Sequence, residues 1–217
     1  MCIRDRAGGD TTASVNGLAI GVTAAGDVAK DRIAYRSGAK PNDLICLSGD
    51  LGAAYMGLHL LEREKRACGG QPDPKPKFEG HEYILGRQLK PEARTDIIER
   101  LAEAGIVPTS MIDITDGLAS ETLHLCKSSG CGARIYLDRL PIARQTHDMA
   151  EELHADPVVA ALNGGQDYEL LFTVPLSKQQ EIFALGVDVI GHVTAAGTGA
   201  MLVTPDGSEI ALKAPGW

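Results

Sequence analysis

The chain has 217 residues, 44% of them hydrophobic and 23% charged, and a formal net charge of −8. These proportions are ordinary for a globular protein, and the acidic balance argues against a nucleic-acid binder, which normally carries a basic patch. No run of eighteen apolar residues is present, which argues against a membrane span. The 25 glycines and 4% aromatic residues favour an α/β protein with many tight turns over an aromatic-packed β-sandwich.

The cysteine pattern argues against a disulfide framework or a zinc site. The number is odd and no Cys-x-x-Cys pair occurs, so we expect a reducing cytosol. The five are Cys2, Cys46, Cys68, Cys126 and Cys131.

The first residues do not resemble the start of a fold. Residues 1–6 lack the apolar core of a signal peptide, and residues 7–12 resemble the interior of a domain. We therefore expect a non-native leader over residues 1–6, followed by an N-terminally incomplete domain. The first motif, Gly8-Gly9-Asp10-Thr11-Thr12, is either a plain loop or a flexible turn whose Asp10 offers oxygen ligands to a hard cation.

Hydrophobic periodicity predicts alternating strands and helices along the chain. The predicted strands cover residues 18–24, 44–48, 111–114, 133–137, 170–174, 187–193 and 201–204. The predicted helices cover residues 53–65, 81–87, 94–103, 118–128, 141–153 and 178–185. Pro205-Asp206-Gly207 predicts a hairpin turn after the last strand.

Arg36 lies in a loop marked by glycine and proline, in Arg36-Ser37-Gly38-Ala39-Lys40. A guanidinium can bind phosphate through two hydrogen bonds, although a single loop arginine is more often surface charge. Both interpretations remain open for Arg36.

Two aspartates interrupt the apolar stretch Met-Ile-Asp-Ile-Thr-Asp-Gly-Leu, residues 111–118. Asp113 and Asp116 would repel each other in apolar surroundings, and a divalent cation such as Mg²⁺ would remove that conflict. The alternative is that Asp116 caps the following helix and Asp113 pairs with a surface cation.

A second polar stretch precedes the predicted strand at residues 170–174. It reads Gly164-Gly165-Gln166-Asp167-Tyr168-Glu169, and Glu169 next to an apolar run is expected to be either paired or functional. The single tryptophan, Trp217, is a core plug, a frayed tail or a stacking platform for an aromatic ligand. Neither a Walker A motif nor a Gly-x-Ser-x-Gly elbow is present.

Taken together and in order, the four motifs resemble the thiamine-monophosphate kinase family of the aminoimidazole ribonucleotide synthetase-like superfamily. They are Gly8-Gly9-Asp10-Thr11, Arg36-Ser37-Gly38-Ala39-Lys40, Ile112-Asp113-Ile114-Thr115-Asp116-Gly117-Leu118 and Gly164-Gly165-Gln166-Asp167-Tyr168-Glu169-Leu170. The closing Gly216-Trp217 adds to the resemblance.

The resemblance implies ATP-dependent phosphorylation of thiamine monophosphate to thiamine diphosphate. It implies that Asp10, Asp113 and Asp116 bind Mg²⁺, and no catalytic residue is identified beyond these metal ligands. The implied ATP contacts are Gly9, Asp10, Arg36 and Thr115, and the implied substrate contacts are Gln166 and Trp217. Phosphoryl transfer depends mainly on positioning and charge neutralisation, which carboxylate-bound Mg²⁺ supplies without a Walker A loop.

The resemblance also implies a cytoplasmic enzyme that is a homodimer at full length. Its expected fold is α/β (α+β), with the end of the N-terminal ATP- and metal-binding domain over residues 7–38 and a complete C-terminal domain over residues 39–217. Because the remaining N-terminal half is expected to be missing, the chain alone is expected to be inactive or nearly so.

One departure concerns the substrate site. The family usually has glutamate where this chain has Gln166, which loses a negative charge facing the thiazolium cation but keeps its hydrogen-bonding capacity. Two other functions remain open: an ATP-dependent synthetase of the same superfamily that acts on a purine precursor, and a non-catalytic fragment.

Overall fold

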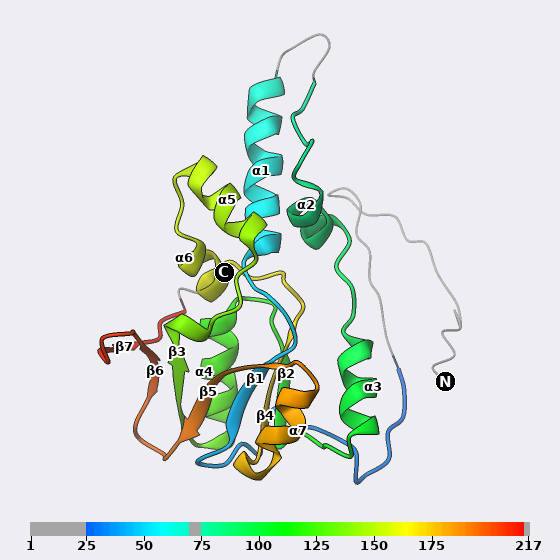
Figure 1. Ribbon diagram of the computed structural model, residues 1–217, viewed down its shortest axis with the longest axis vertical. Helices are drawn as coiled ribbons and strands as arrows, with labels where there is room; N and C mark the ends of the chain where they lie inside the picture. Colours follow the sequence, from blue (N-terminus) through cyan, green and yellow to red (C-terminus); the bar gives the residue numbers. More distant parts are fainter. Residues whose placement is uncertain (1–24, 70–74, 215–217) are drawn as a thin grey trace, which may run out of the picture.

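The computed structural model describes residues 25–69 and 75–214, which form one mixed sheet with helices on both faces (Figure 1). The sheet has seven strands in the order β2-β4-β1-β5-β3-β6-β7. Neighbouring strands are antiparallel except β3 and β6, which are parallel. The strands are β1 (Leu44–Leu47), β2 (Ser110–Asp113), β3 (Gly132–Tyr136), β4 (Leu170–Val174), β5 (Asp188–Thr194), β6 (Ala200–Val203) and β7 (Glu209–Ala211).

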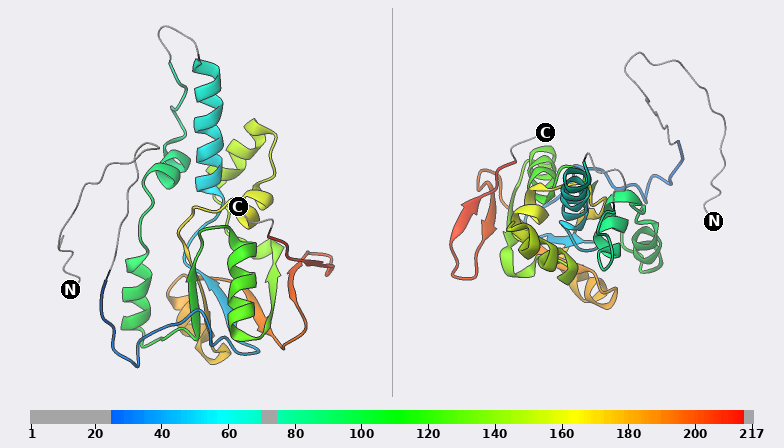
Figure 2. Two further views of the ribbon diagram at one scale, coloured as in Figure 1. Left: turned by 180° about the vertical axis from the view of Figure 1, so that it is seen from behind. Right: turned by 90° about the horizontal axis from the view of Figure 1, so that it is seen from above.

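Helix α4 covers one face of this sheet, α3 and α7 cover the other, and the remaining α-helices of the described residues gather beyond one end of the strands (Figure 2). They are α1 (Ala53–Cys68), α2 (Glu82–Leu89), α3 (Thr95–Glu103), α4 (Leu118–Ser129), α5 (Arg144–Leu153), α6 (Pro157–Asn163) and α7 (Gln179–Ala184). Two short 3₁₀ turns, Leu137–Arg139 and Leu176–Lys178, complete the regular structure. None of the described helices is long and apolar enough to cross a membrane.

Strand β1 shows how the sheet divides two hydrophobic cores. Successive side chains of a strand point to opposite faces. Accordingly, Ile45 and Leu47 pack into the core that includes α4, whereas Leu44 and Cys46 pack into the core shared with α3 and α7. All four residues are buried, as expected for a central strand covered on both sides.

A third hydrophobic cluster joins four helices beyond one end of the sheet, where α1 stands above the strands (Figure 1). Met56 and Leu60 of α1 pack there with Ile84 of α2, and α5 and α6 contribute Met149 and Ala160. This cluster therefore packs α1 against α2, α5 and α6.

The predicted α/β fold is confirmed, and most predicted elements lie within one to three residues of the observed ones. The predicted helix start at Pro141 is wrong, because α5 begins at Arg144 after Ala143 adopts an extended backbone with ψ of 149°. Helix α6 and strand β7 were not predicted, since each is short. The strand expected over residues 18–24 lies outside the described residues.

Candidate functional site

The turn between β2 and α4 carries the two predicted metal ligands. Asp113 is the last residue of β2, and Asp116 lies two residues before Leu118, the first residue of α4. The Thr115 hydroxyl donates a hydrogen bond of 2.7 Å to Oδ2 of Asp113. In the β2–β4 register Asp113 lies opposite Leu170, so the turn sits at the same sheet end as the start of β4.

Both aspartates are solvent-exposed, so the expectation of an apolar environment for them is wrong. The alternative capping role is also wrong for Asp116, because the N-cap of α4 is Gly117 and no side chain caps that helix. Among the described residues Asp113 makes no ion pair with a surface cation; its hydrogen-bond partner is the hydroxyl of Thr115. The two carboxylates therefore remain available to a ligand.

Glu121 of α4 is a buried carboxyl group beside this turn, and it was not among the site residues predicted from the sequence. Its residue is 3% exposed, and its Oε1 accepts a hydrogen bond of 3.3 Å from the backbone N–H of Asp116. Burial raises the pKa of Glu121 to about 7, and the nearby charges of Asp116 and Asp113 act in the same direction. Its Oε2 has no hydrogen-bond partner among the described residues. The sequence did carry one signal for this burial: Glu121 lies on the same helical face as the apolar residues Leu118 and Leu125.

The structure brings Gln166 to the same turn through backbone hydrogen bonds. The N–H of Gln166 donates to the carbonyl oxygen of Thr115 at 2.8 Å, and the N–H of Tyr168 donates to that of Ile114 at 2.9 Å. The side chain of Gln166 is half-buried, and its Oε1 accepts a hydrogen bond of 2.9 Å from the Tyr168 hydroxyl. The two motifs, fifty residues apart, therefore form one surface.

Two glycines permit this close approach. Gly165 has φ of +69°, and a Cβ there would lie 2.4 Å from the carbonyl oxygen of Thr115. Gly117 has φ of +106°, and a Cβ there would lie 2.6 Å from the carbonyl oxygen of Leu162. A side chain at position 165 would push the Gln166 loop away from the turn, and one at position 117 would push the end of α6 away from it.

Asp167 faces away from this surface and binds the beginning of α1. Its carboxylate accepts hydrogen bonds from the N–H of Gly52 at 2.9 Å and of Ala54 at 3.3 Å. These are unsatisfied donors at a helix start, where negative charge is favoured. Burial nevertheless raises the pKa of Asp167 to about 6, because its residue is only 3% exposed.

Glu169 is paired, as one of the two interpretations of the sequence expected. Its carboxylate binds Arg87 of α2, Arg94 just before α3 and the hydroxyl of Ser48. Arg87 and Arg94 line a pocket of about 690 Å³ between α2, α3 and the loop after β1. This pocket and the Thr115–Gln166 surface lie at the same end of the sheet.

The remaining predicted site residues are not brought to the turn by the described structure. Arg36 is exposed, and no ion pair joins it to an acidic residue of the described chain. Its neighbour Tyr35 accepts a hydrogen bond of 2.8 Å from Met111 N–H, so this segment runs beside β2. Gly9, Asp10 and Trp217 lie outside the described residues.

The donors at the turn fit a hard divalent cation in part. Asp113 and Asp116 offer exposed carboxylate oxygens, and Oε2 of Glu121 is a buried acceptor without a partner. Within residues 25–69 and 75–214, no group of three or more His, Cys, Asp or Glu side chains is arranged to hold a metal ion. To hold a cation, Asp113 and Asp116 would therefore need ligands beyond those that the described residues group together.

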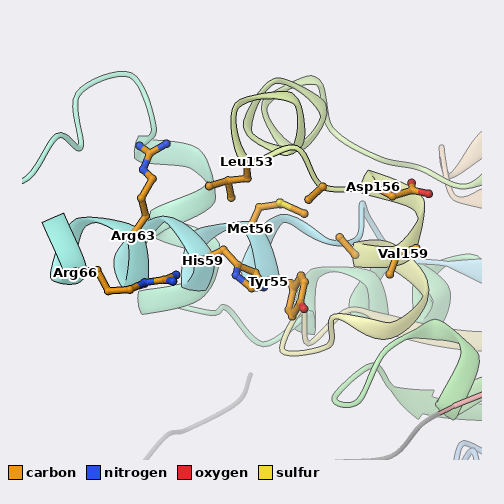
Figure 3. A pocket seen from close by; sticks show the side chains of 10 residues that line it. Tyr55, Met56, His59, Arg63, Arg66, Leu153, Asp156 and Val159 are labelled. Carbon is orange, nitrogen blue, oxygen red and sulfur yellow. The ribbon is translucent and has the colours of Figure 1, made fainter.

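A second pocket, of about 550 Å³, lies between α1 and the α5–α6 segment (Figure 3). Tyr55, His59 and Arg66 point from one side of α1 along this groove, and Leu153 and Val159 line the opposite wall. The rings of Tyr55 and His59 meet edge to face, with centroids 4.4 Å apart. Tyr55 also packs on Gly164, so the groove adjoins the Gln166 loop.

Comparison with known proteins decides the family. The family model described as AIR synthase related protein, C-terminal domain, matches residues 40–204. The chain belongs to the AIR synthase related family. The superfamily expected from the four motifs is thereby confirmed.

Within that family, this AIR synthase related protein is similar to curated thiamine-monophosphate kinases. It is 36% identical to the Escherichia coli K12 protein and 30% identical to the Bacillus subtilis protein, over 97% and 98% of the chain respectively. The chain spans 62% of the length of the E. coli relative and 63% of that of the B. subtilis relative.

Solved structures agree with this placement. The structure described as AaThiL complexed with AMPPCP and TMP is 31% identical with a TM-score of 0.66, covering 82% of this chain and 52% of that one. Thiamine monophosphate kinase from Aquifex aeolicus is 30% identical with a TM-score of 0.65, covering 82% of this chain and 55% of that one. E. coli HypE, at 19% identity and a TM-score of 0.60 over 85% of this chain and 53% of that one, shares the fold.

Proposed function

We propose that this chain is part of an ATP-dependent kinase that converts thiamine monophosphate to thiamine diphosphate. The observation that carries the proposal is the hydrogen bond from Gln166 N–H to the Thr115 carbonyl, because it joins the nucleotide and metal motif to the substrate motif. The similarity to curated thiamine-monophosphate kinases, and to a structure described as complexed with AMPPCP and TMP, supports this choice over a purine-precursor synthetase.

The proposed roles follow from where each group lies. Asp113 and Asp116 would hold Mg²⁺, which neutralises phosphate charge when bound. Thr115 orients the Asp113 carboxylate through its hydroxyl and would contact ATP. The Glu121 carboxyl group accepts a hydrogen bond from the N–H of Asp116 and so fixes the conformation of the turn. Gly9, Asp10, Arg36 and Trp217 keep their predicted roles as proposals.

Gln166 would contact the thiamine part of the substrate. Because its side-chain oxygen already accepts a hydrogen bond from Tyr168, its amide N–H groups are the free donors. A glutamate there would add a negative charge beside the thiazolium cation. Gln166→Glu should therefore tighten binding of thiamine monophosphate, whereas Gln166→Ala should weaken it.

The full activity is best tested on a chimera in which the unmatched part of the E. coli relative is joined to this chain. The expected result is Mg²⁺-dependent formation of thiamine diphosphate from ATP and thiamine monophosphate, detected by chromatography. Loss of that product in the Asp113→Asn chimera would support the proposed metal role. No product from the unmutated chimera, alongside turnover by the E. coli relative, would contradict the proposed function.

Two further features of the whole enzyme are proposals as well. It would work in the cytoplasm, which suits the four free cysteines of the described residues, and as a homodimer. Sedimentation of the chimera over a concentration series would test the dimer.

A further inference from the structure

We propose that Glu169, Arg87 and Arg94 are positioning residues that hold the Gln166 loop against the Thr115–Asp116 turn. The inference rests on the proposed function, since it assigns a task at that same site. None of the three residues belongs to the predicted ligand contacts, and each acts through the backbone that it fixes.

The Glu169 carboxylate is held from three directions. Its side chain is 1% exposed, and Oε1 accepts a hydrogen bond of 2.7 Å from Nη1 of Arg87. Oε2 accepts from Nη1 of Arg94 and from the Ser48 hydroxyl. A buried carboxylate with both oxygens occupied by charged or hydroxyl donors has a single preferred orientation.

Both arginines are themselves fixed. Nη2 of Arg87 donates to the carbonyl oxygens of Asp50 at 3.0 Å and Asp167 at 3.3 Å, so this side chain also touches the Gln166 loop directly. Arg94 donates through Nε and Nη2 to Asp96 at 2.9 Å and 3.0 Å. The cluster therefore ties the loop to α2 and to the beginning of α3.

Backbone hydrogen bonds carry this constraint from Glu169 to the proposed metal turn. Ile114 is the residue before Thr115. Its N–H donates a hydrogen bond of 2.8 Å to the carbonyl oxygen of Glu169. The next two hydrogen bonds run from the N–H of Tyr168 to the carbonyl oxygen of Ile114 and from the N–H of Gln166 to that of Thr115. Three successive backbone hydrogen bonds thus link the ion-pair cluster to both motifs.

The loop needs such support because its backbone is unfavourable in isolation. Gln166 has φ of +64° and Tyr168 has φ of +53°, which non-glycine residues rarely adopt. Such conformations persist where surrounding contacts enforce them, and they gather at functional sites. Buried ion pairs contribute little net stability, whereas they can specify one conformation, which matches the task proposed here.

The test compares Arg94→Met with Arg134→Met. Arg134 is a control for the loss of a shielded, ion-paired arginine: its side chain is 16% exposed against 20% for Arg94, and it pairs at 2.6 Å with Glu209, far from the Gln166 loop and more exposed than Glu169. Amide hydrogen exchange needs no ligand and reports local opening. We expect at least about tenfold faster exchange at Gln166 and Tyr168 in Arg94→Met, and unchanged rates there in Arg134→Met.

Unchanged exchange at Gln166 and Tyr168, or an increase no larger than that of every other amide, would overturn the proposal. If Arg94→Met does not fold, Arg94→Lys keeps the charge but cannot bind Glu169 and Asp96 at once. Arg94→Lys should therefore also speed amide exchange at Gln166 and Tyr168 at least about tenfold. Unchanged exchange at these two residues would overturn the proposal.

Calorimetry on the chimera gives the second readout. We expect Arg94→Met to weaken thiamine monophosphate binding about tenfold, with a smaller effect on Mg-AMPPCP. Adding Arg94→Met to Gln166→Ala should cause little further loss, because both act through the same loop. Full additivity would overturn the proposal. If the unmutated chimera binds no thiamine monophosphate, the proposed function fails, and the exchange data still decide the positioning role.

Discussion

The backbone N–H of Gln166 lies 2.8 Å from the carbonyl oxygen of Thr115 and donates a hydrogen bond to it. This contact joins the turn that carries Asp113 and Asp116 to the loop that carries the proposed substrate ligand. A change on either side should therefore affect ligand binding more than folding, unless it alters a buried contact.

Asp113→Asn and Asp116→Asn should separate ligand binding from stability. Both side chains are exposed, so each change should alter the free energy of unfolding by no more than about 0.5 kcal/mol. Each should weaken Mg-dependent binding of AMPPCP, because a neutral amide is a poorer ligand for a hard cation. Calorimetry combined with a urea melt measures both effects.

Asp138→Asn is a suitable control, since Asp138 is also exposed but lies in the turn after β3. It should leave nucleotide binding unchanged. Equal binding by all three variants would rule out a metal role for the two turn aspartates.

Asp167→Asn should remove a pH dependence of stability. The pKa of Asp167 is raised from 3.8 to about 6 in the folded state, so folding favours the protonated carboxyl group. Its stabilising contribution is complete below about pH 4 and is lost as pH rises to about 6, by up to about 3 kcal/mol.

Urea denaturation at several pH values measures this change. The variant should gain stability relative to the unmutated chain between pH 4 and pH 6, and the difference should stay constant above pH 7. A difference that does not vary with pH would show that Asp167 has the same pKa in both states.

Gly57→Ala and Gly86→Ala should have opposite effects, although both glycines lie inside helices. A Cβ on Gly57 would lie 2.3 Å from the carbonyl oxygen of Ile84, so α1 and α2 would have to separate. A Cβ on Gly86 meets nothing within 4 Å. We expect Gly57→Ala to destabilise by about 1–3 kcal/mol and Gly86→Ala to stabilise by about 0.5–1 kcal/mol.

Thermal and urea melts of the two variants provide the measurement. A stabilising Gly57→Ala would mean that α1 and α2 are farther apart than the structure shows.

Asp156→Ala should weaken the beginning of α6. The Asp156 carboxylate accepts a hydrogen bond of 2.8 Å from Val158 N–H, and Pro157 occupies the first helical position. Removing the cap should cost about 1 kcal/mol, whereas Asp156→Asn keeps an acceptor and should cost only a few tenths. Because Asp156 is exposed, a urea melt near pH 7 isolates the capping effect; equal losses in both variants would assign it to charge instead.

The sequence by itself determined most elements and the family of this protein. A period of 3.6 residues marks α1 and α4, because each of these helices buries one face, and an unbroken apolar run marks β1, which is buried on both faces. Four ordered motifs identified the superfamily. Short elements such as α6 carried too few residues for a period to be visible.

Tertiary structure alone decided how the site is built. The burial of Glu121, the exposure of Asp113 and the pairing of Glu169 all depend on which distant segments fold together. Arg87 and Arg94 lie 82 and 75 residues from Glu169 along the chain. A local pattern cannot specify such partners, because the charge of a side chain is visible in the sequence while its desolvation and its neighbours arise only when the sheet and helices pack.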